Sequence, residues 1–197
     1  AVAVQHAHQQ GVIHRDLKPS NILLDEAQGG APRLTDFGIA MLLDAGMETL
    51  TTPLEGLGTL AYLAPEQASG RRELQGPATD VYGLGAILFH CLTGRAPHVG
   101  DSVGEVLRQV MDGEIPSPRL LNPGVPRDLE TLCLRCLEKD PAKRLPSASL
   151  LADELGRFLA GEPIRSRPIG WGERILRAAA RRPLVAVLAV LLAGSVV

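Results

Sequence analysis

Hydrophobic positions recur at helical spacing through most of the second half of the chain. In residues 102–113, "SVGEVLRQVMDG", the apolar side chains expected on one helix face are Val103, Val106, Leu107 and Val110. The same spacing predicts helices over 127–140 and 147–161. A further helix is predicted from Asp80, placed as its N-cap, to Gly94, which closes it.

The first half of the chain has shorter hydrophobic runs separated by polar loops. A helix is expected to end at Gly11. Two short apolar stretches, Ile22–Leu24 and Arg33–Thr35, are predicted to pair as a β-hairpin across the turn "AQGGAP". A loop rich in Thr, Gly and Leu then runs to Gly76. The pattern therefore predicts many helices and little sheet.

The polar loop "HRDLKPSN", residues 14–21, lies directly before the first apolar strand. A carboxylate such as Asp16 can accept the proton of a hydroxyl while a phosphoryl group is transferred to it. The oxygens of Asn21 and Asp36 are hard ligands suited to Mg²⁺, and Lys18 offers a positive charge to a phosphate. If the hairpin brings these loops together, they form one site. Singly, each acid would be an ordinary solvated loop residue.

Five motifs in order resemble the large C-terminal lobe of the protein kinase family. They are "HRDLKPSN" at 14–21, "DFG" at 36–38, "GTLAYLAPEQ" at 58–67, "DVYGLG" at 80–85 and "EKDPAKR" at 138–144. The resemblance covers residues 1–161. It implies a mainly helical α+β fold, in which a small β-hairpin carries the catalytic and metal-binding loops. It also implies a kinase that uses ATP and Mg²⁺, and "DLKP" is similar to serine/threonine rather than tyrosine kinases.

The resemblance implies a role for each matching residue. Asp16 corresponds to the catalytic base and Lys18 to the lysine that contacts the phosphate. Thr59 corresponds to the threonine that hydrogen-bonds both. The implied nucleotide and metal site consists of Lys18, Leu23 beneath the adenine, and the two Mg²⁺ ligands Asn21 and Asp36.

Other matching residues are implied to support the site. Glu66 and Arg144 resemble the buried ion pair of the lobe, and Asp80 resembles the residue that anchors the catalytic-loop backbone. His14 and Phe37 resemble the packed pair that sets the active arrangement. Gly38 follows Phe37 in the same motif.

The loop from Asp36 to Glu66 corresponds to a kinase activation loop. In the family, an arginine placed like Arg15 pairs with a phosphate on this loop. The candidate phosphorylation sites are Thr49, Thr51 and Thr52; solvated, unmodified threonines are the alternative.

Half of a kinase is missing from these residues. The lysine that anchors ATP lies in a second lobe, whereas the lysines here are only Lys18, Lys139 and Lys143. The chain also begins with Ala1 in mid-helix, so a fragment with little activity of its own is expected. Two functions remain open: a serine/threonine kinase that phosphorylates protein Ser or Thr, or a pseudokinase-like binding module. The retained acids favour the kinase.

The composition limits the possible partners and the cellular compartment. A net charge of −2 gives no bulk attraction to nucleic acid. The three cysteines fit a reducing compartment, and Cys133 and Cys136, although spaced C-x-x-C, fall on the inner face of a predicted helix.

The chain ends in an uncharged run, residues 184–197, preceded by Arg177, Arg181 and Arg182. Positive residues stay on the cytoplasmic side of a membrane. Residues 162–182 are therefore predicted to be a basic juxtamembrane linker, and 183–197 the start of a truncated transmembrane helix. A short buried helix is the alternative for this apolar run. The expectation is a single-pass protein of the cell membrane with a cytoplasmic lobe, for which a homodimer is left open.

Overall fold

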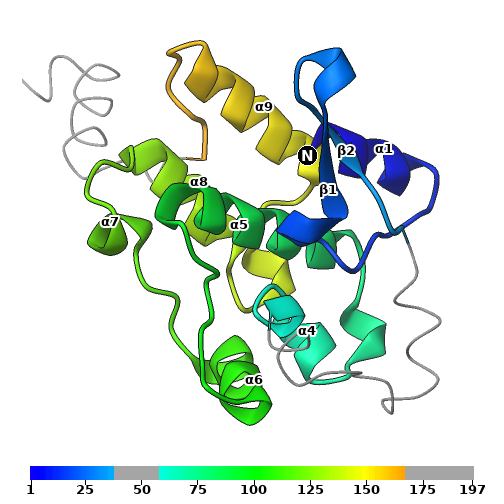
Figure 1. The fold of residues 1–197 in the computed structure, drawn as a ribbon, viewed down its shortest axis with the longest axis vertical. Helices are drawn as coiled ribbons and strands as arrows, with labels where there is room; N and C mark the ends of the chain where they lie inside the picture. Colours follow the sequence, from blue (N-terminus) through cyan, green and yellow to red (C-terminus); the bar gives the residue numbers. More distant parts are fainter. Residues whose placement is uncertain (38–57, 167–197) are drawn as a thin grey trace, which may run out of the picture. The chain divides into compact units, whose positions relative to one another are not determined.

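The structure is a computed structural model that describes residues 1–37 and 58–166. Helix α5, Pro77–Thr93, runs through the middle of the helices (Figure 1) and is buried over much of its length. Its N-cap is Gly76, four residues before the predicted Asp80, because Pro77 suits the first helical turn and the Thr79 hydroxyl accepts the Gly76 N–H at 3.1 Å. The prediction of Asp80 as N-cap is therefore wrong, whereas Gly94 does end the helix, with φ +76°.

Helix α8, Arg127–Cys136, packs against α5. The two helices approach so closely that a Cβ atom on Gly85 would lie 2.5 Å from the Cβ of Cys136. Glycine is required there because any side chain would force the helices apart. Cys133 and Cys136 are both buried, and the Cys133 thiol lies 3.6 Å from the Gly85 carbonyl oxygen.

Helices α1, Val2–Gln9, and α9, Ala148–Leu159, pack against each other beside α5. The N–H of Ser149 donates to the Gln5 side chain at 3.0 Å. Most side chains of the larger buried core come from α1, α5, α8 and α9; the core comprises Val4, Leu17, Val81, Leu84, Leu132, Cys136, Leu145, Ala148, Leu151 and Ile164. A second core cluster lies between α5 and α8 and includes Tyr82 and Phe89.

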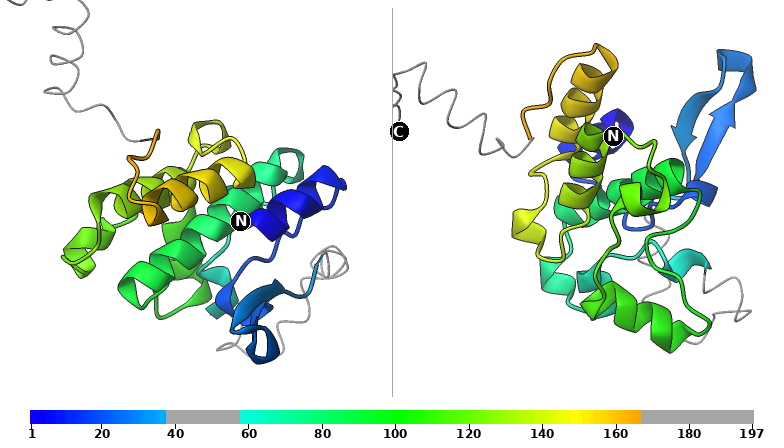
Figure 2. Two further views of the ribbon diagram at one scale, coloured as in Figure 1. Left: turned by 90° about the horizontal axis from the view of Figure 1, so that it is seen from above. Right: turned by 90° about the vertical axis from the view of Figure 1, so that its left-hand side faces the viewer.

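The predicted hairpin is present. Strands β1, Ile22–Asp25, and β2, Ala31–Leu34, are antiparallel and joined through the 3-10 turn η2, Glu26–Gln28. Ile22 pairs with Leu34, and the Thr35 N–H donates to the Asn21 carbonyl at 3.0 Å. The hairpin projects away from the helices (Figure 2).

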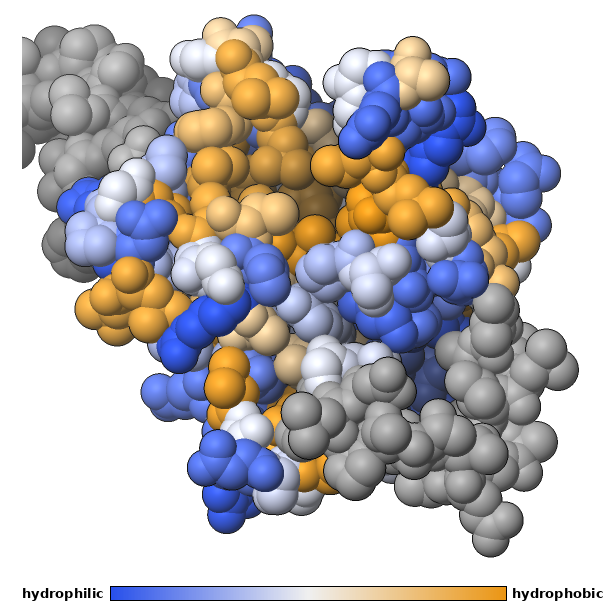
Figure 3. Space-filling view, in the orientation of Figure 1, coloured by the Kyte–Doolittle hydropathy of each residue, from blue (hydrophilic) through white to orange (hydrophobic). Residues whose placement is uncertain are grey.

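Hydrophobic side chains on this hairpin are exposed. Leu23 and Leu24 keep 57% and 67% of their surface open, and hydrophobic surface gathers at the hairpin and at α9 in the space-filling view (Figure 3). An isolated two-stranded hairpin is marginally stable by itself. Here Leu34 of β2 packs against the larger core, and the Thr35 carbonyl lies 2.9 Å from His14 Nε2, so the base of the hairpin is attached to the rest of the molecule.

The remaining elements are short or peripheral. They are the helices α4, Pro65–Ala68, α6, Val103–Asp112, and α7, Pro118–Leu121, and the 3-10 turns η1, Pro19–Asn21, η3, Arg72–Leu74, and η4, Pro141–Lys143. The ammonium of Lys139 caps α6, donating to the carbonyls of Gln109 and Val110 at 3.1 and 2.6 Å.

One compact unit comprises residues 1–165. Ile164 is buried, and the Arg165 N–H donates to Glu154 at 2.8 Å. Within residues 1–37 and 58–166, no helix combines the length and the apolar character needed to cross a membrane. The predicted membrane segment at 183–197 lies outside the described residues, as do Gly38, Thr49, Thr51 and Thr52.

Candidate active site

Asp80, near the start of α5, holds the backbone of the polar loop. Its Oδ2 accepts the His14 N–H and its Oδ1 accepts the Arg15 N–H, both at 2.8 Å. Arg15 has φ +65°, a left-handed conformation that is unfavourable for a side chain of this size. Charged acceptors make strong hydrogen bonds, so the buried carboxylate of Asp80 offsets this backbone strain.

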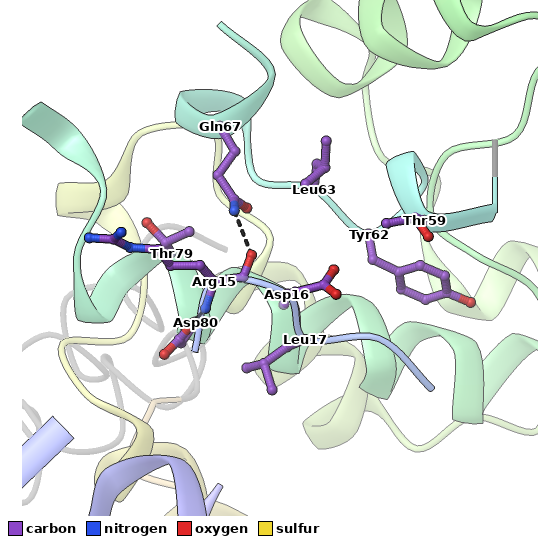
Figure 4. A pocket seen from close by; sticks show the side chains of 10 residues that line it. Arg15, Asp16, Leu17, Thr59, Tyr62, Leu63, Gln67, Thr79 and Asp80 are labelled. Carbon is purple, nitrogen blue, oxygen red and sulfur yellow. Dashed lines mark hydrogen bonds between the residues drawn. The ribbon is translucent and has the colours of Figure 1, made fainter. Parts of the chain in front are cut away.

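Two further side chains fix the same loop from outside. The Gln67 amide donates to the Arg15 carbonyl at 2.6 Å (Figure 4). The His8 Nε2 atom of α1 lies 2.7 Å from the Asp80 Oδ2 atom, and both side chains are almost fully buried. The loop is therefore fixed by α1, α4 and α5 together.

The His14 side chain connects the loop to the end of β2. Its Nε2 lies 2.9 Å from the Thr35 carbonyl oxygen, and its Nδ1 lies 3.3 Å from the Asp16 nitrogen. Since the carbonyl can only accept and the Asp16 N–H only donates, this geometry assigns the ring proton to Nε2. The rings of His14 and Phe37 are in contact, with centroids 4.6 Å apart.

Asp16 lies at the centre of a polar cluster. The Lys18 ammonium is 2.8 Å from the Asp16 carboxylate and 3.3 Å from the Thr59 hydroxyl. The Asn21 amide donates to the Asp16 carboxylate at 2.9 Å and to its carbonyl at 2.8 Å. The carboxylate points toward the segment that carries Thr59 (Figure 4). The structure thus brings together four residues that the sequence singled out.

Asp36 approaches this cluster through the hairpin. It follows Thr35, whose N–H is bonded to the Asn21 carbonyl, so the second acid lies one residue beyond a direct contact with Asn21. Asp36 itself is exposed and has φ +60°. The carboxylate accepts the Thr35 hydroxyl at 3.3 Å.

Glu66 and Arg144 form a buried, two-pronged ion pair with both N–O distances at 2.7 Å. The carbonyls of Ala78, Glu138 and Lys139 accept the other guanidinium N–H groups. Burial raises the pKa of Glu66, but the hydrogen bonds and charge of Arg144 outweigh it and leave that pKa below its ordinary value. The pair joins α4 to the turn before α9 and lies apart from Asp16.

The sequence and the geometry agree with one known family. A family profile described as "Protein kinase domain" matches residues 1–155. The chain belongs to the protein kinase family.

Named relatives of this kinase chain are bacterial. The serine/threonine-protein kinase PrkC of Bacillus subtilis is 42% identical over 146 residues, 74% of this chain and 22% of the relative. PkaA of Streptomyces coelicolor is 45% identical over 179 residues, 89% of this chain and 31% of the relative. PknB of Mycobacterium tuberculosis is 37% identical over 162 residues, 82% of this chain and 25% of the relative. The chain thus spans a third or less of these relatives.

Sequence reasoning missed several polar residues of this kinase chain. His8 and Gln67 hold the catalytic loop, and the Thr79 hydroxyl donates to Glu66 at 2.9 Å. Two histidines bond tyrosines: His90 to Tyr62 and His98 to Tyr82. Apart from Glu66 and Thr79, the two members of each hydrogen-bonded pair are separated by 16 to 72 residues in the sequence. No local sequence pattern could therefore reveal these contacts.

Proposed function

We propose that the chain carries the phosphoryl-transfer site of a serine/threonine protein kinase. Such an enzyme moves the γ-phosphoryl group of ATP to a Ser or Thr hydroxyl of a protein. The single observation that carries this proposal is the contact of the Asp16 carboxylate with both Lys18 and Asn21. A solvated surface acid would have no need of two such partners, one charged and one buried.

Each member of the cluster has a task in this reaction. The oxygen of the substrate hydroxyl attacks the γ-phosphorus, and the bond from that phosphorus to the ADP oxygen breaks. The Asp16 carboxylate accepts the proton that the hydroxyl loses. Lys18 neutralises charge on the phosphoryl group during transfer. Thr59 and Asn21 restrain the lysine and the acid, so little reorganisation is needed when the substrate arrives.

The donor set fits Mg²⁺ at Asn21 and Asp36. The Asn21 amide donates its N–H groups to Asp16, and no hydrogen bond to its Oδ1 atom is found among the described residues. An amide oxygen and an exposed carboxylate, one residue from a backbone contact, are the hard ligands this ion prefers. The bound ion would screen the negative charge of the ATP phosphates.

ATP requires more than these residues supply. Leu23, proposed to lie beneath adenine, is largely exposed. Lys139 caps α6 and Lys143 is exposed on η4, so neither stands at the site to anchor the phosphates. We therefore propose that a further lobe completes the nucleotide site and covers the hairpin. The 197-residue chain alone is expected to show little phosphate transfer.

Regulation is proposed to involve Arg15. Its Nε atom is buried and has no hydrogen-bond partner among the described residues, an arrangement that a phosphate oxygen would satisfy. Phosphorylation of Thr49, Thr51 or Thr52 would supply one.

The C-terminal residues are proposed to tether the kinase to the cell membrane, with its lobe on the cytoplasmic side. The support is the sequence alone: an uncharged run from 184 to 197 behind three arginines. Deleting residues 183–197, together with any apolar continuation, should move the protein from the membrane to the soluble fraction on cell fractionation.

Phosphate transfer by the full-length protein tests the proposed function. With Mg-ATP and a peptide pool carrying one Ser or Thr between degenerate flanks, the wild type should form phosphopeptides. Asp16→Asn should lower the rate by about 10² to 10⁴-fold, as expected for loss of a general base. Asp25→Asn, an acid at the far end of β1, is the matched control and should keep the rate. A protein that binds ATP and transfers nothing would be a binding module instead.

A further inference from the structure

A hydrogen bond between Tyr62 and His90 has no part in the chemistry described so far. The Tyr62 hydroxyl oxygen lies 2.6 Å from His90 Nδ1. The two rings are nearly parallel, with an interplanar angle of 26° and centroids 6.1 Å apart. Tyr62 belongs to the segment 59–67, which lies before and within α4, and His90 lies in the last turns of α5.

Segment 59–67 forms a wall of the hollow beside Asp16. Thr59, Tyr62, Leu63 and Gln67 line this hollow together with Asp16 (Figure 4). A peptide whose hydroxyl reaches Asp16 would therefore lie beside this segment. Side-chain hydrogen bonds hold it along its length: Thr59 to Lys18, Tyr62 to His90, Gln67 to the Arg15 carbonyl, and Glu66 to Arg144 and Thr79.

These attachments are not equivalent. Thr59 and Gln67 fix the segment to the loop of residues 14–21, and Glu66 fixes its C-terminal end to Arg144 and to the start of α5. Among the described residues, the Tyr62–His90 bond is the one side-chain bond that ties the centre of the segment to another element, the last turns of α5. Helix α5 is built into both core clusters, so it provides a rigid support. Loss of the bond would leave the centre of the segment held only by its own backbone hydrogen bonds and by packing, although both of its ends would stay fixed.

The chemistry of the pair is well defined. Burial raises the pKa of Tyr62, and nearby Cys91 raises it further. The phenol therefore keeps its proton and can donate it. A His90 imidazole with its ring proton at Nε2 presents Nδ1 as the acceptor for this hydroxyl. An acceptor at the Nδ1 position is thus the feature of His90 that Tyr62 uses.

We propose that His90 is a positioning residue for the protein substrate. Its imidazole holds Tyr62, and through Tyr62 the segment 59–67, in the place that receives the substrate residues beside the phosphorylated hydroxyl. The inference rests on the proposed kinase function. It concerns binding of the peptide rather than of ATP or the transfer step itself.

Steady-state kinetics of the full-length kinase test this role. His90→Leu removes the acceptor and should raise the KM for the degenerate peptide pool about five- to tenfold, the value of one hydrogen bond. The KM for ATP should stay within about twofold, since no ATP contact is lost. His90→Asn places an amide oxygen where Nδ1 stood and should restore the peptide KM. An unchanged peptide KM, equal shifts in both KM values, or no rescue by Asn would each overturn the proposal.

A second tyrosine–histidine pair provides the matched control. Tyr82 and His98 are hydrogen-bonded at 2.8 Å and are both fully buried in the core, away from the hollow. His98→Leu should lower the melting temperature and leave the peptide KM unchanged. If His98→Leu raised the peptide KM as His90→Leu does, the effect would be one of general stability and the proposal would fail.

Amide hydrogen exchange separates this inference from the proposed function. The N–H groups of Tyr62 and Leu63 bond to the carbonyls of Thr59 and Leu60 at 3.2 Å. His90→Leu should speed exchange at both amides, and His90→Asn should not. An inactive wild type would contradict the kinase function but not this result. Unchanged exchange in His90→Leu would contradict the role of His90 even in an active enzyme.

Discussion

Single residues of this kinase chain act through several partners at once. Asp80 accepts two backbone N–H groups of the catalytic loop and contacts His8. Asp80 lies in the first turn of α5, where an acidic side chain usually stabilises a helix through its interaction with the helix dipole. This position in the helix does not explain its contacts with the loop and with His8. The strained backbone at Arg15 persists because Asp80 and Gln67 hold it from opposite sides.

His98 is a second residue with an unusual environment. It is buried beside Tyr82, and burial, with a smaller effect of the Lys139 charge, lowers its pKa to about 4. The unfolded chain takes up this proton near pH 6.5, while the folded chain does not until about pH 4. Below pH 6.5 the unfolded state therefore binds more protons, and the protein loses stability as the pH falls.

Denaturant unfolding at two pH values tests this effect. Between pH 7.5 and pH 5, His98 should lower the free energy of unfolding by about 2 kcal/mol. His98→Gln, whose Oε1 can accept the Tyr82 hydroxyl as Nε2 does, should lose this part of the pH dependence. Equal pH dependence in the wild type and His98→Gln would show that His98 titrates normally in the folded state.

At the scale of elements, the Glu66–Arg144 pair joins parts of the chain that share few other contacts. It connects α4 with the turn before α9 and, through the Ala78 carbonyl and Thr79, with the start of α5. The guanidinium also lies over the Tyr82 ring, 4.9 Å from its centroid. Removing either partner leaves a buried charge or carboxyl group without compensation.

The expected cost of breaking this pair is large. Glu66→Gln should lower the free energy of unfolding by about 3–5 kcal/mol, because Arg144 stays buried and charged. Disrupting the exposed Arg33–Asp25 pair by Arg33→Gln should cost at most about 1 kcal/mol, although the N–O distance is the same 2.7 Å. Similar losses for both variants would mean that water reaches Glu66.

Elements with strong local signals were predicted well from sequence. The helix ending at Gly94 and the hairpin were both placed within a few residues. The start of α5 was missed because its N-cap is Gly76 and not Asp80, whose carboxylate accepts backbone N–H groups of His14 and Arg15 instead. That competition for Asp80 is decided by tertiary contacts, which a local pattern does not contain.

At the scale of the whole molecule, two polar loops meet because a hairpin lies between them. The backbone bond from Thr35 to Asn21 brings the "DFG" loop to the catalytic loop, as the hairpin prediction required. The cluster of Asp16, Lys18, Asn21 and Thr59 could be anticipated from the motifs. The contributions of His8, Gln67 and His90 could not, because each depends on how helices distant in sequence pack together.

The Mg²⁺ requirement of phosphate transfer tests the central claim most directly, namely that Asn21 and Asp36 hold one cation beside Asp16. In the full-length kinase at fixed ATP, Asn21→Ala and Asp36→Asn should each raise the Mg²⁺ concentration for half-maximal transfer by about tenfold or more. Asp25→Asn, at the end of β1 that is remote from Asn21, should leave this Mg²⁺ concentration unchanged. An unaltered Mg²⁺ requirement in Asn21→Ala and Asp36→Asn would contradict the account.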